Sequence, residues 1–310
     1  MKSVLLALLL WSAGVSADAP RPISRPGIAA IVTDARLGEL SGLARSGYAR
    51  DRYWAINDGG NGNRLLLIDG RGHVLRSYEV PGVDNIDWED ITSFEWRQRK
   101  RLLIADSGDN TGTRHDVRLL LVDEPDPNAP QRTLERPLLL PLRYADAPHD
   151  VEAVTVDASR GEILLLTKRT VPPVLLRVPL SAFDHPHGGV VPEKLLDLDG
   201  VPQPSERDIA RDGALSRYRS QTTAMKLDCS GRGLLVLTYD AVYRYQRRPG
   251  QSWGEALAGQ QPGRSPISLL PQAEAMELDS ECQNLYIGSE KAPVPLLRYR
   301  YRPLPESSGR

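Results

Sequence analysis

Hydrophobic and polar positions repeat along the chain in five similar units. Each unit opens with a polar residue, a spacer, a second polar residue, a small residue and an aliphatic residue. The opening segments are residues 39–43, 87–91, 150–154, 221–225 and 272–276, which read ELSGL, DWEDI, DVEAV, QTTAM and QAEAM. A turn and a hydrophobic run follow each of them, at residues 53–56, 102–105, 163–166, 234–237 and 285–288. This pattern predicts two short, turn-linked strands at the start of every unit.

Further strand-like runs complete the units. A third strand is expected at residues 64–69, 117–123, 174–180, 241–246 and 296–302. A fourth is expected in the first four units, at residues 73–80, 136–143, 193–198 and 266–270. The fifth unit ends before its fourth strand, but an unassigned β-like segment at residues 27–33 precedes the first unit. Four strands per unit, with the N-terminal strand completing the last one, predict an all-β protein.

The repeat predicts a single β-propeller domain at residues 18–310, with five four-stranded blades closed by the N-terminal strand. Such closure removes the exposed sheet edges of an open array. Insertions rich in Pro, Gly, Ser or charge are expected to form loops. They lie at residues 123–132, 184–191, 201–220 and 249–265. A sixth blade would require strands within residues 201–220, where no strand pattern is found.

The first 17 residues have the features of a secretory signal. Lys2 gives the charged start, residues 4–11 form a short apolar run, and Val15-Ser16-Ala17 provides a small-residue cleavage site. No segment reaches the ~20 apolar residues that a membrane-spanning helix needs. We therefore expect a periplasmic or secreted monomer without a transmembrane anchor. The formal net charge of −1 gives no reason to expect nucleic acid as a partner.

Two cysteines in an exported chain suggest one disulfide, and the alternative is that they are unpaired structural cysteines. Cys229 and Cys282 each lie in the turn between the first two strands of neighbouring units. A bridge between them would tie two adjacent blades together. We expect it to be structural.

Alternating strand directions bring the start of each first strand and the end of each second strand to one face. This face therefore collects polar, mainly acidic residues around the axis. Like charges in a small space raise one another's pKa, so a cation is expected there, and Ca²⁺ suits an oxygen-rich site. The candidate metal ligands are Glu89, Asp106, Glu152 and Glu274. The alternative is that these carboxylates cap turns by accepting backbone N–H bonds.

Basic residues near the same face are candidates for binding an anionic substrate. They are Arg114, Lys168, Arg169 and Lys291, of which Lys168 is also a candidate catalytic residue. His149 is expected near this face, at the mouth of the central axis, and could act as an acid or base. The alternative is that the basic side chains are solvated or form local ion pairs.

Other reaction classes find little support. No histidine and cysteine spacing typical of zinc occurs, and we expect His185 and His187 to be exposed in a loop. No Gly-x-Ser-x-Gly motif is present.

Several segments, in order along most of the chain, resemble a family of exported bacterial propellers. They are residues 40–43, 87–91, 104–110, 150–153, 167–168 and 273–276. The family is described as phytase-like, or as having esterase-like activity of phytase, and overlaps the SdiA-regulated propellers. The resemblance implies a Ca²⁺-dependent phosphoesterase or esterase acting at the acidic mouth. Unit four departs from the pattern, because Gln221 and Thr223 replace the acids.

Two functions remain open from the sequence. The first is a metal-dependent hydrolase of small phosphate or carboxylic esters, in which a metal-bound water attacks the ester. The second is a non-catalytic propeller that carries a structural ion and binds a protein, glycan or envelope partner. The fold alone cannot decide between them.

Overall fold

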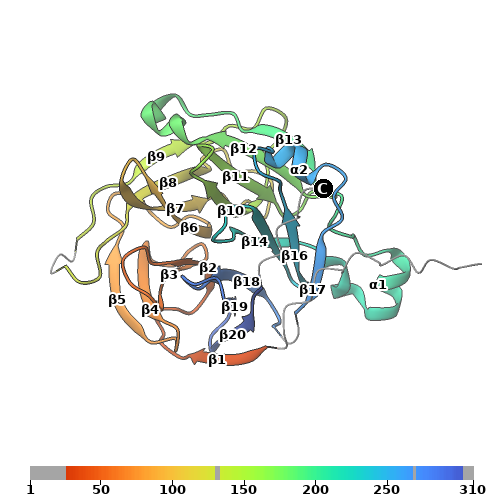
Figure 1. Ribbon diagram of the computed structural model, residues 1–310, viewed down its shortest axis with the longest axis horizontal. Helices are drawn as coiled ribbons and strands as arrows, with labels where there is room; N and C mark the ends of the chain where they lie inside the picture. Colours follow the sequence, from red (N-terminus) through yellow and green to blue (C-terminus); the bar gives the residue numbers. More distant parts are fainter. Residues whose placement is uncertain (1–25, 130–132, 268–269, 303–310) are drawn as a thin grey trace, which may run out of the picture.

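The computed structural model describes residues 26–129, 133–267 and 270–302, which form five four-stranded antiparallel sheets around a central axis (Figure 1). Blade 1 contains β2 (Leu40–Arg45), β3 (Arg52–Asn57), β4 (Arg64–Asp69) and β5 (Val74–Glu79). Blade 2 contains β6 (Trp88–Trp96), β7 (Arg99–Asp106), β8 (Arg118–Asp123) and β9 (Leu138–Pro141). Blade 3 contains β10 (Val151–Asp157), β11 (Glu162–Thr167), β12 (Val174–Pro179) and β13 (Glu193–Asp197). Blade 4 contains β14 (Thr222–Leu227), β15 (Gly233–Thr238), β16 (Ala241–Gln246) and β17 (Gly263–Pro266).

The N-terminal strand closes the ring. Blade 5 contains β18 (Ala273–Leu278), β19 (Asn284–Ser289) and β20 (Val294–Arg300), and its outermost strand is β1 (Gly27–Val32), which pairs antiparallel with β20. The first strands of neighbouring blades contact one another in a complete circle, β2 to β6, β10, β14, β18 and back to β2. The expected five-bladed propeller with N-terminal closure is therefore confirmed.

The first strand of every blade carries an irregularity at the same place. The pairing register with the second strand shifts at Ser41, Glu89, Glu152, Thr223 and Glu274. At such a bulge the extra residue is left out of the regular ladder and its side chain is re-aimed. These five positions are the second polar residues of the repeated segments. In every blade, the side chain at this position therefore departs from the regular alternation of the strand.

The hydrophobic core lies between the blades. Five clusters of buried residues each join one blade to the next, such as the cluster in which Trp54 of blade 1 packs with Trp88 and Ile91 of blade 2. Trp54 and Trp88 are fully buried and pack between blades 1 and 2. The core leaves the axis itself to polar side chains.

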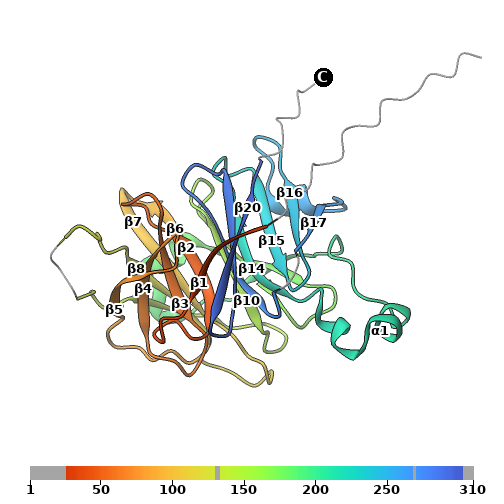
Figure 2. The same ribbon diagram turned by 90° about the horizontal axis from the view of Figure 1, so that it is seen from below.

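The insertions contain helices where loops were expected. Residues 201–220 hold α1 (Glu206–Asp212) and a 3-10 helix at Ala214–Tyr218, which project from the side of the propeller (Figure 2). Helix α1 starts at a capping box in which Ser205 and Asp208 satisfy each other's backbone N–H groups. The short helix α2 (Trp253–Leu257) lies within residues 249–265 and buries Trp253 against blade 4. No sixth blade arises from residues 201–220.

Two details of the expected boundaries change. The fourth strand of blade 4 is β17 at Gly263–Pro266, so the expected strand at residues 266–270 was placed too late along the chain. Residues 184–191 contain a 3-10 turn at Pro186–Gly188, and His185 and His187 on this segment are exposed, as expected.

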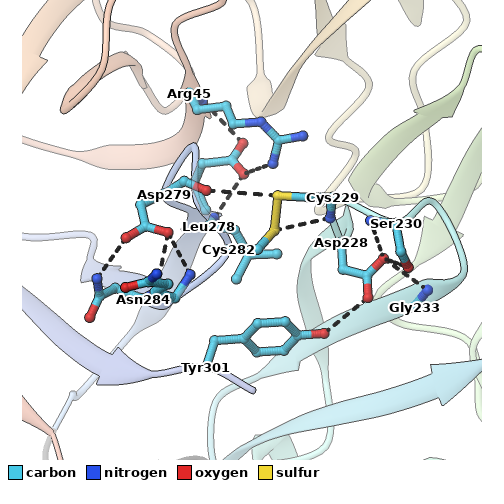
Figure 3. Close-up of a disulfide and its surroundings, with 12 residues drawn as sticks. Arg45, Asp228, Cys229, Ser230, Gly233, Leu278, Asp279, Cys282, Asn284 and Tyr301 are labelled. Atoms are coloured by element: carbon cyan, nitrogen blue, oxygen red, sulfur yellow. Dashed lines mark hydrogen bonds and ion pairs between the residues drawn. A yellow bond between two sulfur atoms is a disulfide. The ribbon is translucent and has the colours of Figure 1, made fainter. Parts of the chain in front are cut away.

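The expected disulfide is formed between Cys229 and Cys282, with the Cα atoms 6.0 Å apart (Figure 3). The surrounding turns are ordered by carboxylates, since Asp228 accepts hydrogen bonds from Ser230 and Gly233 and Asp279 accepts one from Asn284 (Figure 3). The bridge therefore joins two well-braced turns of blades 4 and 5.

The expected signal at residues 1–17 lies outside the described residues. Among the residues that are described, no helix is long and apolar enough to cross a membrane.

Candidate functional site

Three bulged glutamates meet on the axis. Glu89, Glu152 and Glu274 come from blades 2, 3 and 5, and each offers a carboxylate oxygen within 4.8 Å of the others. All three are buried, with 3%, 2% and 5% of their surface exposed. We call these three residues the axial glutamate cluster. It unites three of the four expected metal ligands.

Glu89 has the most exceptional environment of the three. Its side chain is 3% exposed, and no described residue donates a hydrogen bond to its carboxylate. The carboxylate passes close to Gly108, where a Cβ atom would lie 1.9 Å from Glu89 Oε1. The missing side chain at Gly108 thus leaves room for this carboxylate.

Lys168 and Tyr239 contact the other two glutamates. Both follow the second strand of their blade, so they reach the same face as the bulged residues. Lys168 Nζ lies 2.7 Å from Glu152 Oε2 and 3.8 Å from Glu274 Oε1. Tyr239 donates its hydroxyl to Glu274 Oε1 over 2.7 Å. One ammonium group and one hydroxyl therefore face three carboxylates.

The electrostatics follow from this excess of acids. Burial, with the neighbouring Glu152 carboxylate, raises the pKa of Glu89 well above its usual value. Burial also raises the pKa of Glu152 to about 8, although the Lys168 ammonium opposes that shift. Burial alone would lower the pKa of Lys168, but Glu152 and Glu274 outweigh it and raise that pKa well above the usual value. The two glutamates therefore favour the charged form of Lys168.

A second, more exposed acidic group adjoins the first. Asp58, Asp87 and Glu89 also offer oxygens within 4.8 Å of one another. Burial and the Asp58 carboxylate raise the pKa of Asp87 to about 6. Glu290 lies nearby, and burial together with Glu274 and Asp58 raises its pKa to about 7. The acidic groups therefore extend from the axial glutamate cluster to Asp58, Asp87 and Glu290.

Asp106 lies outside the axial glutamate cluster. Its buried carboxylate is held between Arg114 Nη2 at 3.0 Å and Arg118 Nε at 2.9 Å. Arg114 also donates to Asp116 and to the carbonyl oxygen of Gly108. Asp106 and Arg114, both expected site residues, thus form an ion pair with each other. A local ion pair was the alternative that the sequence left open for the basic side chains.

The remaining expected residues lie around the rim. Arg169 donates to Asp150 over 2.6 Å, and Lys291 is exposed beside blade 5. His149 Nε2 lies 3.0 Å from Asp146 Oδ1, and its ring stacks edge-on against Tyr144. No contact joins His149, Arg169 or Lys291 to the axial glutamate cluster among the described residues.

A buried ion pair crosses the axis further along it. Lys226 Nζ of blade 4 lies 2.6 Å from Asp90 Oδ1 of blade 2, and the side chains are 1% and 0% exposed. Asp90 also accepts the N–H of Val154 in blade 3 over 3.0 Å. Beyond this pair, a cavity of about 300 Å³ opens among the turns between first and second strands, including Asp157 and Asp228. The Asp90–Lys226 pair thus ties three blades together.

The donor set of the axial glutamate cluster suits a hard divalent cation. Ca²⁺ takes six to eight oxygen ligands at about 2.3–2.6 Å, and three carboxylate oxygens within 4.8 Å of one another can surround such an ion. The carboxylate of Glu89, to which no described residue donates a hydrogen bond, is the specific feature that this ion would satisfy. Soft or zinc-type ligands are absent from this group.

Three neighbours of the cluster were not among the expected site residues. They are Asp58, Asp87 and Tyr239. The repeat already indicated them, since Asp58 and Tyr239 follow second strands and Asp87 starts the second unit. The repeat did not predict how far each of these side chains extends toward the axis.

No protein-family model matches the chain, and no curated protein matches it. Solved structures with a similar arrangement are β-propellers at low identity. A β-propeller domain from Myceliophteria thermophila is 17% identical with a TM-score of 0.38, covering 86% of this chain and 74% of its own. The endo-arabinase from Bacteroides thetaiotaomicron is 12% identical with a TM-score of 0.47, covering 90% and 99%. A nidogen/laminin complex gives 13% identity and a TM-score of 0.44, covering 82% and 73%. Likeness at this level carries no conclusion about what this chain does.

Proposed function

We propose that this protein is an exported monomeric β-propeller that binds Ca²⁺ at the axial glutamate cluster and hydrolyses small phosphate or carboxylic esters. The observation that carries the proposal is the buried carboxylate of Glu89, which faces Glu152 and Glu274 without a hydrogen-bond partner among the described residues. A largely buried carboxylate close to two others is stabilised by a proton or by a bound cation.

The residues fit the roles that such a reaction needs. A divalent cation bound there would supply charge neutralisation and an acidified water molecule. Lys168, whose charged form is favoured beside the cluster, is suited to binding an anionic oxygen of a substrate. Tyr239 orients Glu274 through its hydroxyl. The resemblance of the sequence to phytase-like propellers supports the same reaction class.

Export is proposed from two features of the chain. Residues 1–17 have the pattern of a secretory signal, and the Cys229–Cys282 bridge suits an oxidising compartment.

One observation favours a second candidate function, a non-catalytic propeller with a structural ion. The three glutamates expose at most 5% of their surface, which leaves little room for a substrate to reach the ion. In that case the ion would stabilise the ring, and a protein, glycan or envelope partner would bind elsewhere.

The test begins with cation binding. The mature chain is treated with a chelator, and Ca²⁺ binding is measured by calorimetry together with the melting temperature. We expect one tightly bound ion and a higher melting temperature with Ca²⁺, since a ligand at 100 times its Kd adds about 2.7 kcal/mol. Glu89→Gln should lose this response, while Glu79→Gln on the exposed edge of blade 1 should keep it. Absence of Ca²⁺ binding by the unaltered chain at millimolar concentration would refute the metal site.

A substrate panel then separates the two candidates. Nitrophenyl phosphate and nitrophenyl acetate are assayed with Ca²⁺ and with chelator. Turnover that requires Ca²⁺ and is lost in Glu89→Gln supports the hydrolase. Ca²⁺ binding without turnover of either ester supports the structural ion.

A further inference from the structure

Lys168 occupies a singular place in the axial site. It follows Thr167 at the end of β11, and its side chain is 7% exposed. Its ammonium contacts Glu152 at 2.7 Å and lies 3.8 Å from Glu274. These are two of the three carboxylates that converge on the axis, so the lysine shares its partners with any bound metal ion.

We propose that Lys168 and a divalent cation compete for these carboxylates, so that Lys168 is a built-in counter-ion that the cation displaces. This inference rests on the proposed cation site, and it assigns Lys168 a role in setting the affinity of that site.

The distances support competition. A Ca²⁺ ion lies about 2.3–2.6 Å from its oxygen ligands, close to the 2.7 Å between Lys168 Nζ and Glu152 Oε2. An ion bound by all three glutamates would therefore lie within a few ångströms of the ammonium. Two positive charges that close, in a site shielded from water, repel each other strongly. The flexible four-carbon stem of a lysine allows the ammonium to move away.

The ammonium of Lys168 already lies over the ring of Tyr239, with Nζ 5.4 Å from the ring centroid, and aromatic faces attract cations at such distances. A movement away from Glu152 and closer to this ring would keep the contact with Tyr239. From there the ammonium no longer needs Glu152 and can contact an anionic oxygen of a substrate. Cation binding would thus convert Lys168 from an internal counter-ion into a free donor at the mouth.

The experiment measures Ca²⁺ affinity by calorimetry on the full mature chain and two variants. Lys168→Gln removes the competing charge, and we expect it to bind Ca²⁺ at least tenfold more tightly than the unaltered chain. Lys194→Gln removes the same charge from the exposed outer strand of blade 3, where it pairs with Asp197, and should leave the affinity unchanged.

The outcomes distinguish this inference from the proposed function. If the unaltered chain binds Ca²⁺ and Lys168→Gln binds it equally or more weakly, competition is refuted and the metal site stands. If only Lys168→Gln binds Ca²⁺, competition is supported and the proposed Ca²⁺-dependent function is refuted. If neither protein binds Ca²⁺, both are refuted.

A second measurement needs no variant, in case Lys168→Gln fails to fold. The unaltered chain is treated with an amine-acylating reagent, and modification of Lys168 is followed by mass spectrometry. Saturating Ca²⁺ should raise the rate at Lys168 several-fold and leave Lys194 unchanged. An unchanged or lower rate at Lys168 when Ca²⁺ is bound would overturn the inference.

Discussion

The buried Asp90–Lys226 pair offers a direct test of how the blades are held together. In Lys226→Met, Asp90 would lose the ammonium 2.6 Å from its Oδ1 atom while remaining fully buried. Removing one partner of a buried pair typically costs about 3–5 kcal/mol, because the remaining charge is uncompensated. Asp90 would keep the backbone N–H groups of Val154 and Ile91, so we expect a loss of about 3 kcal/mol in the free energy of unfolding.

The assay is urea unfolding monitored by tryptophan fluorescence. Three proteins are compared: the unaltered chain, Lys226→Met, and the double variant that combines Asp90→Asn with Lys226→Met. The double variant should be more stable than Lys226→Met, because it holds no buried charge. Burial, opposed by Lys226, raises the pKa of Asp90 to about 6, and loss of the lysine should raise it further. A protonated Asp90 does not need the lysine, so the loss should be smaller at pH 5 than at pH 8.

The reasoning would be wrong if Lys226→Met lost less than about 1 kcal/mol with an unchanged dependence on urea. It would also be wrong if the double variant were no more stable than the single one.

Three further predictions concern the axis and the blade contacts. Folding raises the pKa values of acids such as Asp87 (to about 6) and Glu152 (to about 8). The free energy of unfolding, measured with chelator present, should therefore decrease as the pH rises from about 4 to about 8, and a flat profile would contradict this. Replacing Cys229 and Cys282 by serine opens a bridge between positions 53 residues apart and should cost about 4 kcal/mol by urea unfolding, and a loss below 1 kcal/mol would exclude a stapling role. In Gly42→Ala the new Cβ would lie 2.9 Å from the backbone nitrogen of Ile91 in blade 2. The melting temperature should therefore fall by an amount that corresponds to a loss of about 1–3 kcal/mol. An unchanged melting temperature would show that blades 1 and 2 can move slightly apart.

The sequence was informative about the fold because the repeat is a local signal. Each blade is a run of short strands joined by turns, and the polar segment before each first strand marks where a blade begins. The N-terminal strand could be assigned because the fifth unit lacked a fourth strand. The helices at residues 206–212 and 253–257 were not found, since they are short and lie in segments rich in turn residues.

The site was only partly predictable, for reasons of side-chain direction. Glu89, Glu152 and Glu274 share a repeat position and do converge. Asp106 is just as acidic and ends a second strand, yet it turns to Arg114 and Arg118. Asp90 pairs with a lysine 136 positions away in the sequence. Pairings of this kind depend on which blades are opposite across the axis, and no local pattern encodes that.

The repeated bulge allows the residue at the axis to differ between blades without a change in strand pairing. Where the bulged residue is a glutamate, it adds an ionisable carboxyl group to the axis. Where it is Ser41 or Thr223, the hydroxyl instead donates over 2.7 Å to a backbone carbonyl of the next blade, at Trp88 or Ala273. Since the bulged residue lies outside the regular ladder, exchanging a hydroxyl for a carboxylate there alters the axis and one contact between blades, while the strand pairing is kept. A five-bladed ring of this kind can thus change the number of its axial carboxyl groups one blade at a time.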